Sequence, residues 1–147
     1  MRATDNPATD GKLTALQAAL AAEQAASYGY GVVGAHLTGA AFAIASADWV
    51  IHERARDELT AIIEALGASP QPAAAAYQLP VAVRNAADAA RLAVDLELEV
   101  LTAYLGLVAV ADPGLRTLAA KNMQGASVRA ARWGGQPQAF PGLATRD

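Results

Sequence analysis

The chain has 147 residues, the length of a single domain, and a formal net charge of −3. This charge gives no electrostatic reason to expect nucleic acid or an anionic membrane as a partner. Hydrophobic residues make up 54% of the chain and aromatic residues only 5%, because alanine carries much of the apolar content. Alanine is the strongest helix former, so the composition favours an all-α fold. Cysteine is absent, which excludes disulfides, Cys-ligated zinc and iron–sulfur clusters and suits a cytoplasmic protein.

The N-terminal part of the sequence contains no pattern that targets or inserts a chain into a membrane. The first residues lack the apolar core that follows the basic region of a signal peptide. Residues 24–47 carry no Asp, Glu, Lys or Arg, but they are rich in alanine and include four glycines and His36. A spanning helix needs about 20 strongly apolar residues, so we interpret this segment as two soluble helices that meet at a turn.

Four stretches have small or apolar residues three or four positions apart, which is the spacing of one helix face. Thr9 and Asp10 are candidate caps for the first helix, and Thr38 is a candidate cap for the second. The predicted helices cover about residues 10–35, 39–66, 85–111 and 115–133.

The connections between these helices predict the topology. Short turns join the first helix to the second and the third to the fourth, so each pair should form an antiparallel hairpin. Residues 67–84 contain three prolines and form a crossover; about 17 extended residues reach roughly 55 Å, more than the ~40 Å length of a 27-residue helix. Two hairpins joined by one long crossover form a ferritin-like four-helix bundle. We therefore predict a single domain over residues 1–147, with a C-terminal tail at 134–147.

Several short segments resemble an alanine-rich family of bacterial proteins that is classed as ferritin-like and has no known function. The resemblance implies the bundle fold for nearly the whole chain but brings no established activity. The segments that carry it are EQAASYGYG at 23–31, HERARD at 52–57, AYQLP at 76–80, VRAARW at 128–133 and FPG at 140–142.

Three residues occupy the positions where such a bundle would hold metal. Ferritin-like two-metal sites take one Glu from each of two helices and a Glu-x-x-His motif from each of the other two. Glu23, His52 and Glu97 lie on the predicted inner faces of the first, second and third helices. Trp49 stands three residues before His52, however, where the motif needs Glu, and Asp48 is a poor substitute.

The fourth helix lacks every residue type that such a site requires. Residues 115–133 contain no Asp, Glu or His but carry Arg116, Lys121, Arg129 and Arg132. Two divalent ions need several anionic oxygens, which a helix with only cationic groups cannot supply. The sequence therefore disfavours a di-iron oxidase of the standard type.

A buried carboxylate must be paired, coordinated or protonated, and three interpretations stay open for Glu23, His52 and Glu97. In the first, they form an ion-paired core cluster without a cofactor, with Arg129 or Asn122 in place of the metal charge. In the second, they bind a single divalent metal ion together with water. In the third, the register of the helices keeps them apart.

These observations favour a non-enzymatic bundle with a degenerate, metal-free site that acts through protein contacts or an unknown ligand. The alternative is a metal-binding protein with a reduced mononuclear site or oxidase activity. A third class is a small-molecule binder that uses the bundle interior. Ala- and Gly-rich helix faces also allow close approach between helices and predict a homodimer. We expect neither nucleic acid nor a membrane as partner, and a cytoplasmic location.

Overall fold

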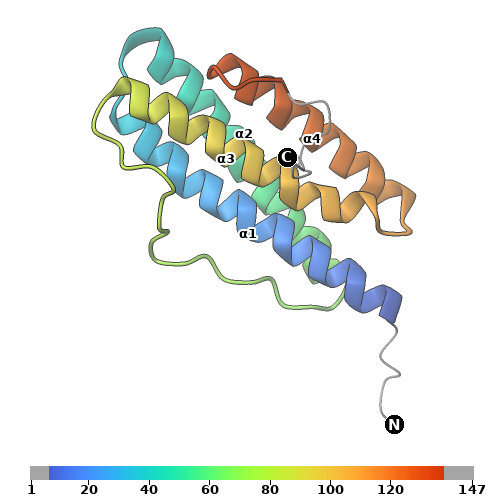
Figure 1. Cartoon of the computed structure of the whole chain (residues 1–147). Helices are drawn as coiled ribbons and strands as arrows, with labels where there is room; N and C mark the ends of the chain where they lie inside the picture. The colour runs from blue at the N-terminus through green and yellow to red at the C-terminus, as the bar shows by residue number, and fades with distance from the viewer. Residues whose placement is uncertain (1–6, 138–147) are drawn as a thin grey trace.

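The computed structural model describes residues 7–137, which contain four α-helices and no β-strand (Figure 1). The all-α, four-helix prediction is confirmed for this part of the chain. None of its helices is long and apolar enough to cross a membrane. The helices are α1 (Pro7–Ala35), α2 (Gly39–Ala65), α3 (Ala86–Val108) and α4 (Pro113–Arg132).

The first helix begins before its expected start, and the third ends before its expected end. Helix α1 begins at Pro7, so Thr9 and Asp10 lie inside the helix and do not cap it. Proline suits a first helical position because its missing N–H would have no partner there. Helix α3 ends at Val108, three residues before the expected end. Thr38 does precede α2, but its side chain makes no capping hydrogen bond.

Helix α4 begins at Pro113, two residues before the expected start, because Asp112 caps it. The Asp112 Oδ1 atom accepts a hydrogen bond from the Leu115 N–H at 3.1 Å. Lys12 of α1 donates to the other carboxylate oxygen at 3.0 Å. The Asp112 side chain therefore both starts α4 and connects it to α1.

Helices α1 and α3 form the centre of the packing. Helix α1 packs on both α2 and α3, and α3 also packs on α4. Where α1 passes α3, a Cβ atom added to Gly29 would lie 2.5 Å from Leu96 Cδ1. Glycine at this position therefore permits the close approach of the two central helices.

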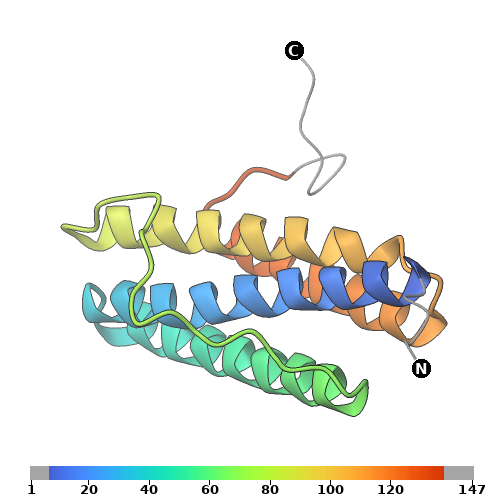
Figure 2. The ribbon, with the colours of Figure 1, turned by 90° about the horizontal axis from the view of Figure 1, so that it is seen from below.

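The connection between α2 and α3 runs along the length of the bundle (Figure 2). Two glutamines of α1 hold it in place. The Gln17 side chain donates to one backbone carbonyl of the connection and accepts from the Gln71 N–H, both at 2.8 Å. Gln24 donates to the Gln71 carbonyl at 2.8 Å, and the rings of Tyr28 and Tyr77 lie 5.5 Å apart. The crossover is therefore attached to α1 by polar side chains as well as by ring contact.

The apolar core has two parts. One is built around Leu16, Leu20 and Leu101, and the other around Tyr30 and Leu92. Both parts contain residues of α1 and α3. Buried polar side chains lie on the same helices between these apolar positions, and they form the candidate site.

Candidate functional site

Six ionisable side chains from all four helices are buried in the middle of the bundle. The sequence prediction that Glu23, His52 and Glu97 face the interior agrees with their exposures of 1%, 0% and 0%. We call the six residues the central network. Its members are Glu23 and Tyr30 of α1, Asp48 and His52 of α2, Glu97 of α3 and Arg129 of α4.

His52 connects the carboxylates of two other helices. Its Nδ1 lies 2.6 Å from Glu23 Oε2, and its Nε2 lies 3.0 Å from Glu97 Oε1. Burial disfavours the charged ring, but the hydrogen bonds and charges of Glu23 and Glu97 outweigh it and raise the pKa of His52 to about 9. The ring is therefore an imidazolium at neutral pH and donates a hydrogen bond from each nitrogen.

Glu97 is the acceptor that most of the network shares. Its Oε1 accepts from Arg129 Nε at 2.8 Å, from the Tyr30 hydroxyl at 2.6 Å and from His52. Burial alone would raise the pKa of Glu97, but His52 and then Arg129 outweigh burial and hold it below its ordinary value. The other oxygen, Oε2, is buried and makes no hydrogen bond with any described residue.

Tyr30 completes the packing around the ion pairs. Its ring stacks on the His52 ring, with centroids 5.0 Å apart and an interplanar angle of 26°. Burial, followed by the negative charge of Glu97, raises the pKa of Tyr30 above its ordinary value. The hydroxyl therefore keeps its proton and remains a donor to Glu97.

Asp48 forms a second arm that attaches the end of α4 to α2. It is 1% exposed and accepts a hydrogen bond from Trp133 Nε1 at 2.9 Å. Arg132, the last residue of α4, donates to its other oxygen. The Tyr30 hydroxyl lies 3.5 Å from Asp48, so the two arms of the network meet at this ring.

The charges of this region balance. The carboxylates of Glu23, Asp48 and Glu97 face three cations, which are protonated His52, Arg129 and Arg132. Charges that are taken out of water are tolerated when each has an opposite partner and its hydrogen bonds are made. The region therefore needs no bound ion to reach neutrality.

These residues do not fit a ferritin-like metal centre. A metal would need an imidazole nitrogen with a free lone pair, whereas both nitrogens of His52 face carboxylates. The Arg129 guanidinium also contacts the carboxylate of Glu97, which would have to bind the ion. Within residues 7–137, no three or more His, Asp or Glu side chains are arranged so that they could share a metal ion.

One predicted member does not join the network, and others were not predicted. Asn122 donates its side-chain amide to Leu118 O of its own helix at 2.9 Å. This bond satisfies the side-chain amide within α4, two turns before Arg129. The sequence did not predict the contact of Tyr30 with Glu97 or the contacts of Arg132 and Trp133 with Asp48.

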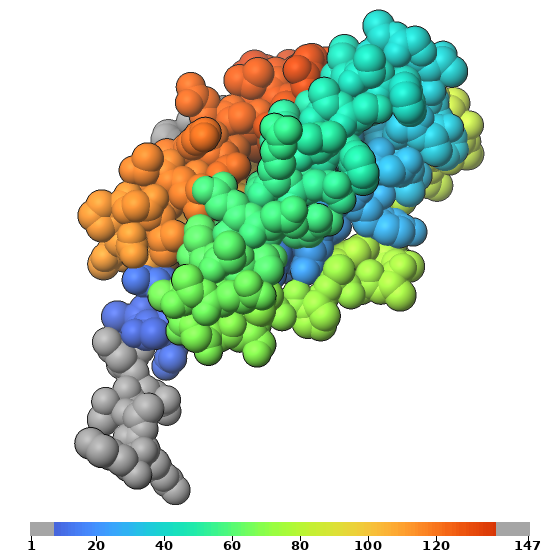
Figure 3. Space-filling view, turned by 180° about the vertical axis from the view of Figure 1, so that it is seen from behind, coloured from blue at the N-terminus to red at the C-terminus, as the bar shows by residue number. Residues whose placement is uncertain are grey.

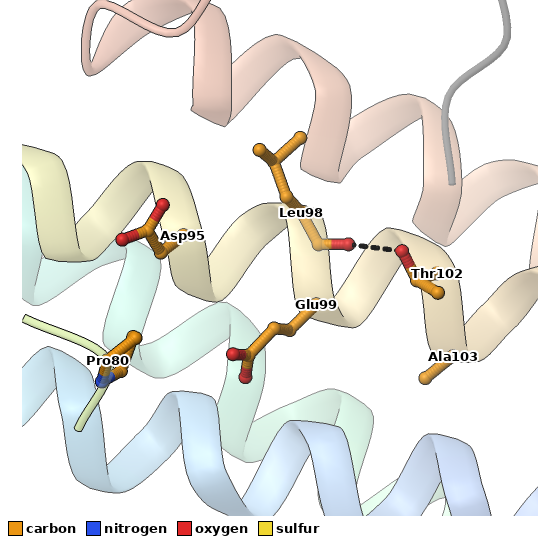
Figure 4. A pocket seen from close by; sticks show the side chains of 6 residues that line it. All are labelled: Pro80, Asp95, Leu98, Glu99, Thr102 and Ala103. Carbon is orange, nitrogen blue, oxygen red and sulfur yellow. Dashed lines mark hydrogen bonds between the residues drawn. The ribbon is translucent and has the colours of Figure 1, made fainter. Parts of the chain in front are cut away.

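An open depression of about 570 Å³ follows the outer side of α3 and is separate from the network (Figure 4). Asp95 and Glu99 are among the residues that line it. Burial, and then the charge of Asp95, raises the pKa of Glu99. Thr102 donates its hydroxyl back to Leu98 O at 2.9 Å. The depression has no buried polar group that points to a particular ligand.

Two comparisons relate the chain to other proteins. A family model described as "Domain of unknown function (DUF4439)" matches residues 15–145. The crystal structure of a conserved hypothetical protein, rv2844, from Mycobacterium tuberculosis is 36% identical, with a TM-score of 0.82. This match covers 84% of the present chain and 95% of the other. No curated protein matches the sequence.

Proposed function

The chain belongs to the DUF4439 family of unknown function, and we propose that it is a non-enzymatic, ferritin-like bundle in which the central network replaces a metal centre. One observation carries this proposal. His52 uses both ring nitrogens to bind carboxylates, and the Arg129 guanidinium contacts Glu97 at 2.8 Å. The positive charge that an ion would bring is supplied by these two side chains.

In this proposal the network fixes the arrangement of the helices. Each helix contributes at least one charged member, so sliding one helix along another would leave a buried charge without its partner. Buried polar groups of this kind can specify one packing arrangement at some cost in stability. The function is then exerted by the surface of a rigid bundle, through contacts with another molecule.

Metal analysis tests the proposal. The full chain is purified without chelators, incubated with Mn²⁺, Fe²⁺ or Zn²⁺, desalted and measured by plasma mass spectrometry. We expect less than stoichiometric metal and no metal-dependent shift in the melting temperature. Since the chain has only two histidines, the exposed His36 provides a matched control. Stoichiometric metal that is lost in His52→Ala but kept in His36→Ala would overturn the proposal.

The alternative is one divalent ion held by Glu23, His52 and Glu97 with water. A single observation favours it, since Glu97 Oε2 is buried without a described hydrogen-bond partner. Binding would require His52 to lose a proton and one of its carboxylate contacts. In this alternative, metal uptake would increase as the pH rises through about 9, the pKa of His52. In our proposal the metal content stays low across that range.

A further inference from the structure

The first half of α2 has an apolar outer face. Phe42, Trp49, Val50 and Ile51 are 49%, 39%, 37% and 40% exposed. From residue 39 to 51 the only charged side chain is Asp48, which is buried. In the view from behind, α2 crosses the face of the molecule and no other described segment lies over it (Figure 3). Apolar groups gathered on an uncovered face mark a site of contact with another molecule.

This face also contains a depression of about 310 Å³ between α1 and α2. Its volume is at the lower limit for small-molecule sites, which span about 300–1,000 Å³. Two exposed aromatic side chains, Phe42 and Trp49, form part of its wall, and the buried Tyr30 ring also contacts it. The lining residues are Tyr30, Gly31, Gly34, Ala35, Phe42, Ala45, Ser46 and Trp49.

Packing within the chain does not explain Gly31 in this depression. Glycine inside a helix is less favourable than alanine. A Cβ atom added to Gly31 would meet nothing within 4 Å, whereas one added to Gly29 would clash with Leu96. The space above Gly31 therefore serves no contact inside the described chain and is open to a group from outside.

The chemistry of the face favours a protein surface over a membrane or nucleic acid. Helices that lie on anionic membranes carry Lys or Arg beside their apolar face, and nucleic acid requires a basic patch. Residues 39–51 contain no basic residue, and the whole chain has a net charge of −3. An interface with few charges is typical of homodimers, whose buried contact areas are more apolar than other protein interfaces.

We propose that the first half of α2 binds a second copy of this chain around a two-fold axis. The face carries both parts of a self-complementary contact, with projecting aromatic side chains beside a depression that has glycine at its surface. A two-fold axis brings the same patch of both copies together, so Trp49 of each copy can enter the depression of the other. The interface does not depend on whether the central network binds metal.

The oligomeric state of the full chain tests this interface. Sedimentation equilibrium across the micromolar range should give twice the 15.0 kDa mass of one chain. Trp49→Lys and Gly31→Leu should both give the monomer mass. Gly31→Leu should keep the helical circular dichroism of the wild type, because a Cβ atom at this position meets nothing within 4 Å. This variant therefore separates loss of the interface from loss of the fold.

Val108→Lys is the matched control, because Val108 is also 39% exposed but lies at the end of α3. It should remain dimeric. A monomeric wild type would overturn the proposal, as would a folded Trp49→Lys or Gly31→Leu variant that stays dimeric. So would a wild type that stays monomeric but binds vesicles of phosphatidylcholine and phosphatidylserine.

Discussion

The middle of α2 differs sharply between its inner and outer sides. The inner side buries Asp48 and His52 at 1% and 0% exposure, and the outer side exposes Trp49, Val50 and Ile51. A surface helix ordinarily turns apolar residues inward and polar residues outward. Here the distribution is reversed over one turn. The inner side is stabilised by partners from the other helices, whereas the three outer side chains remain 37–40% exposed.

The two sides should therefore respond differently to substitution. A buried ion pair contributes little net stability, but removing one partner leaves an uncompensated charge. An exposed side chain has no such dependent partner, and substitutions on the surface usually change stability by about 0.5 kcal/mol or less. Three experiments measure this contrast.

The largest effect is expected for Arg129→Met, which removes the cation that contacts Glu97 but keeps an unbranched apolar side chain. The free energy of unfolding should fall by about 3–5 kcal/mol, because Glu97 would be left with a weaker set of partners in the core. Urea denaturation measures this change. Arg54→Met on the exposed part of α2 is the control and should change stability by less than about 0.5 kcal/mol. Equal effects of the two variants would show that the network is not energetically distinct from the surface.

The second effect is a loss of stability at alkaline pH. The pKa of His52 is raised from 6.5 to about 9 in the folded chain, so the folded state binds the proton more tightly than the unfolded state. The resulting stabilisation is fully present below pH 6.5 and is lost as the pH rises through about 9. Its size is about 3 kcal/mol, from 1.36 kcal/mol per pKa unit.

Urea denaturation between pH 6 and pH 10 measures this dependence. His52→Gln should be less stable at neutral pH and should lack most of the alkaline decline. His36→Gln should keep the wild-type profile, because His36 is exposed in the turn after α1 and hydrogen-bonds only the Val32 backbone carbonyl. A wild-type stability that is flat from pH 6.5 to pH 9 would contradict the assignment of a charged ring.

The smallest effect compares two glycines of α1 that face opposite environments. Gly31→Ala should raise stability by about 1 kcal/mol, because alanine is the better helix former and the added methyl meets no neighbour. Gly29→Ala should lower stability, because its Cβ would lie 2.5 Å from Leu96. Measurement in dilute protein keeps association from contributing. A destabilising Gly31→Ala would show that the surface around Gly31 is more tightly packed than the structure indicates.

Helical periodicity was enough to predict much of this arrangement. A spacing of three or four residues places Glu23, His52 and Glu97 on inner faces, and the charge of the last helix identifies Arg129 as a partner. Which cation reaches which carboxylate depends on the register between helices, and the sequence does not contain it. Asn122, the alternative to Arg129, instead donates to a carbonyl of its own helix, because a polar side chain can also bind locally. The contacts of Asp48 with the end of α4 depend on the same unseen register.

Local chemistry explains the differences at the helix ends. Asp112 followed by Pro113 is a strong start signal, since the carboxylate caps the helix and proline suits the first position. The predicted ranges leave this pair between the third and fourth helices, so the predicted start is residue 115. The helical state was therefore easier to predict than its ends, where a single side chain decides the position.

The attachment of the crossover to α1 has a consequence for its exposure to proteases. Many enzymes that bind extended peptides do so as a neighbouring strand would, by pairing with a backbone N–H and a backbone carbonyl. At the beginning of the crossover, Gln17 already binds one group of each kind with its own amide. One side chain thus occupies the backbone groups that an enzyme would otherwise pair with. It thereby shields a connection that has no secondary structure of its own.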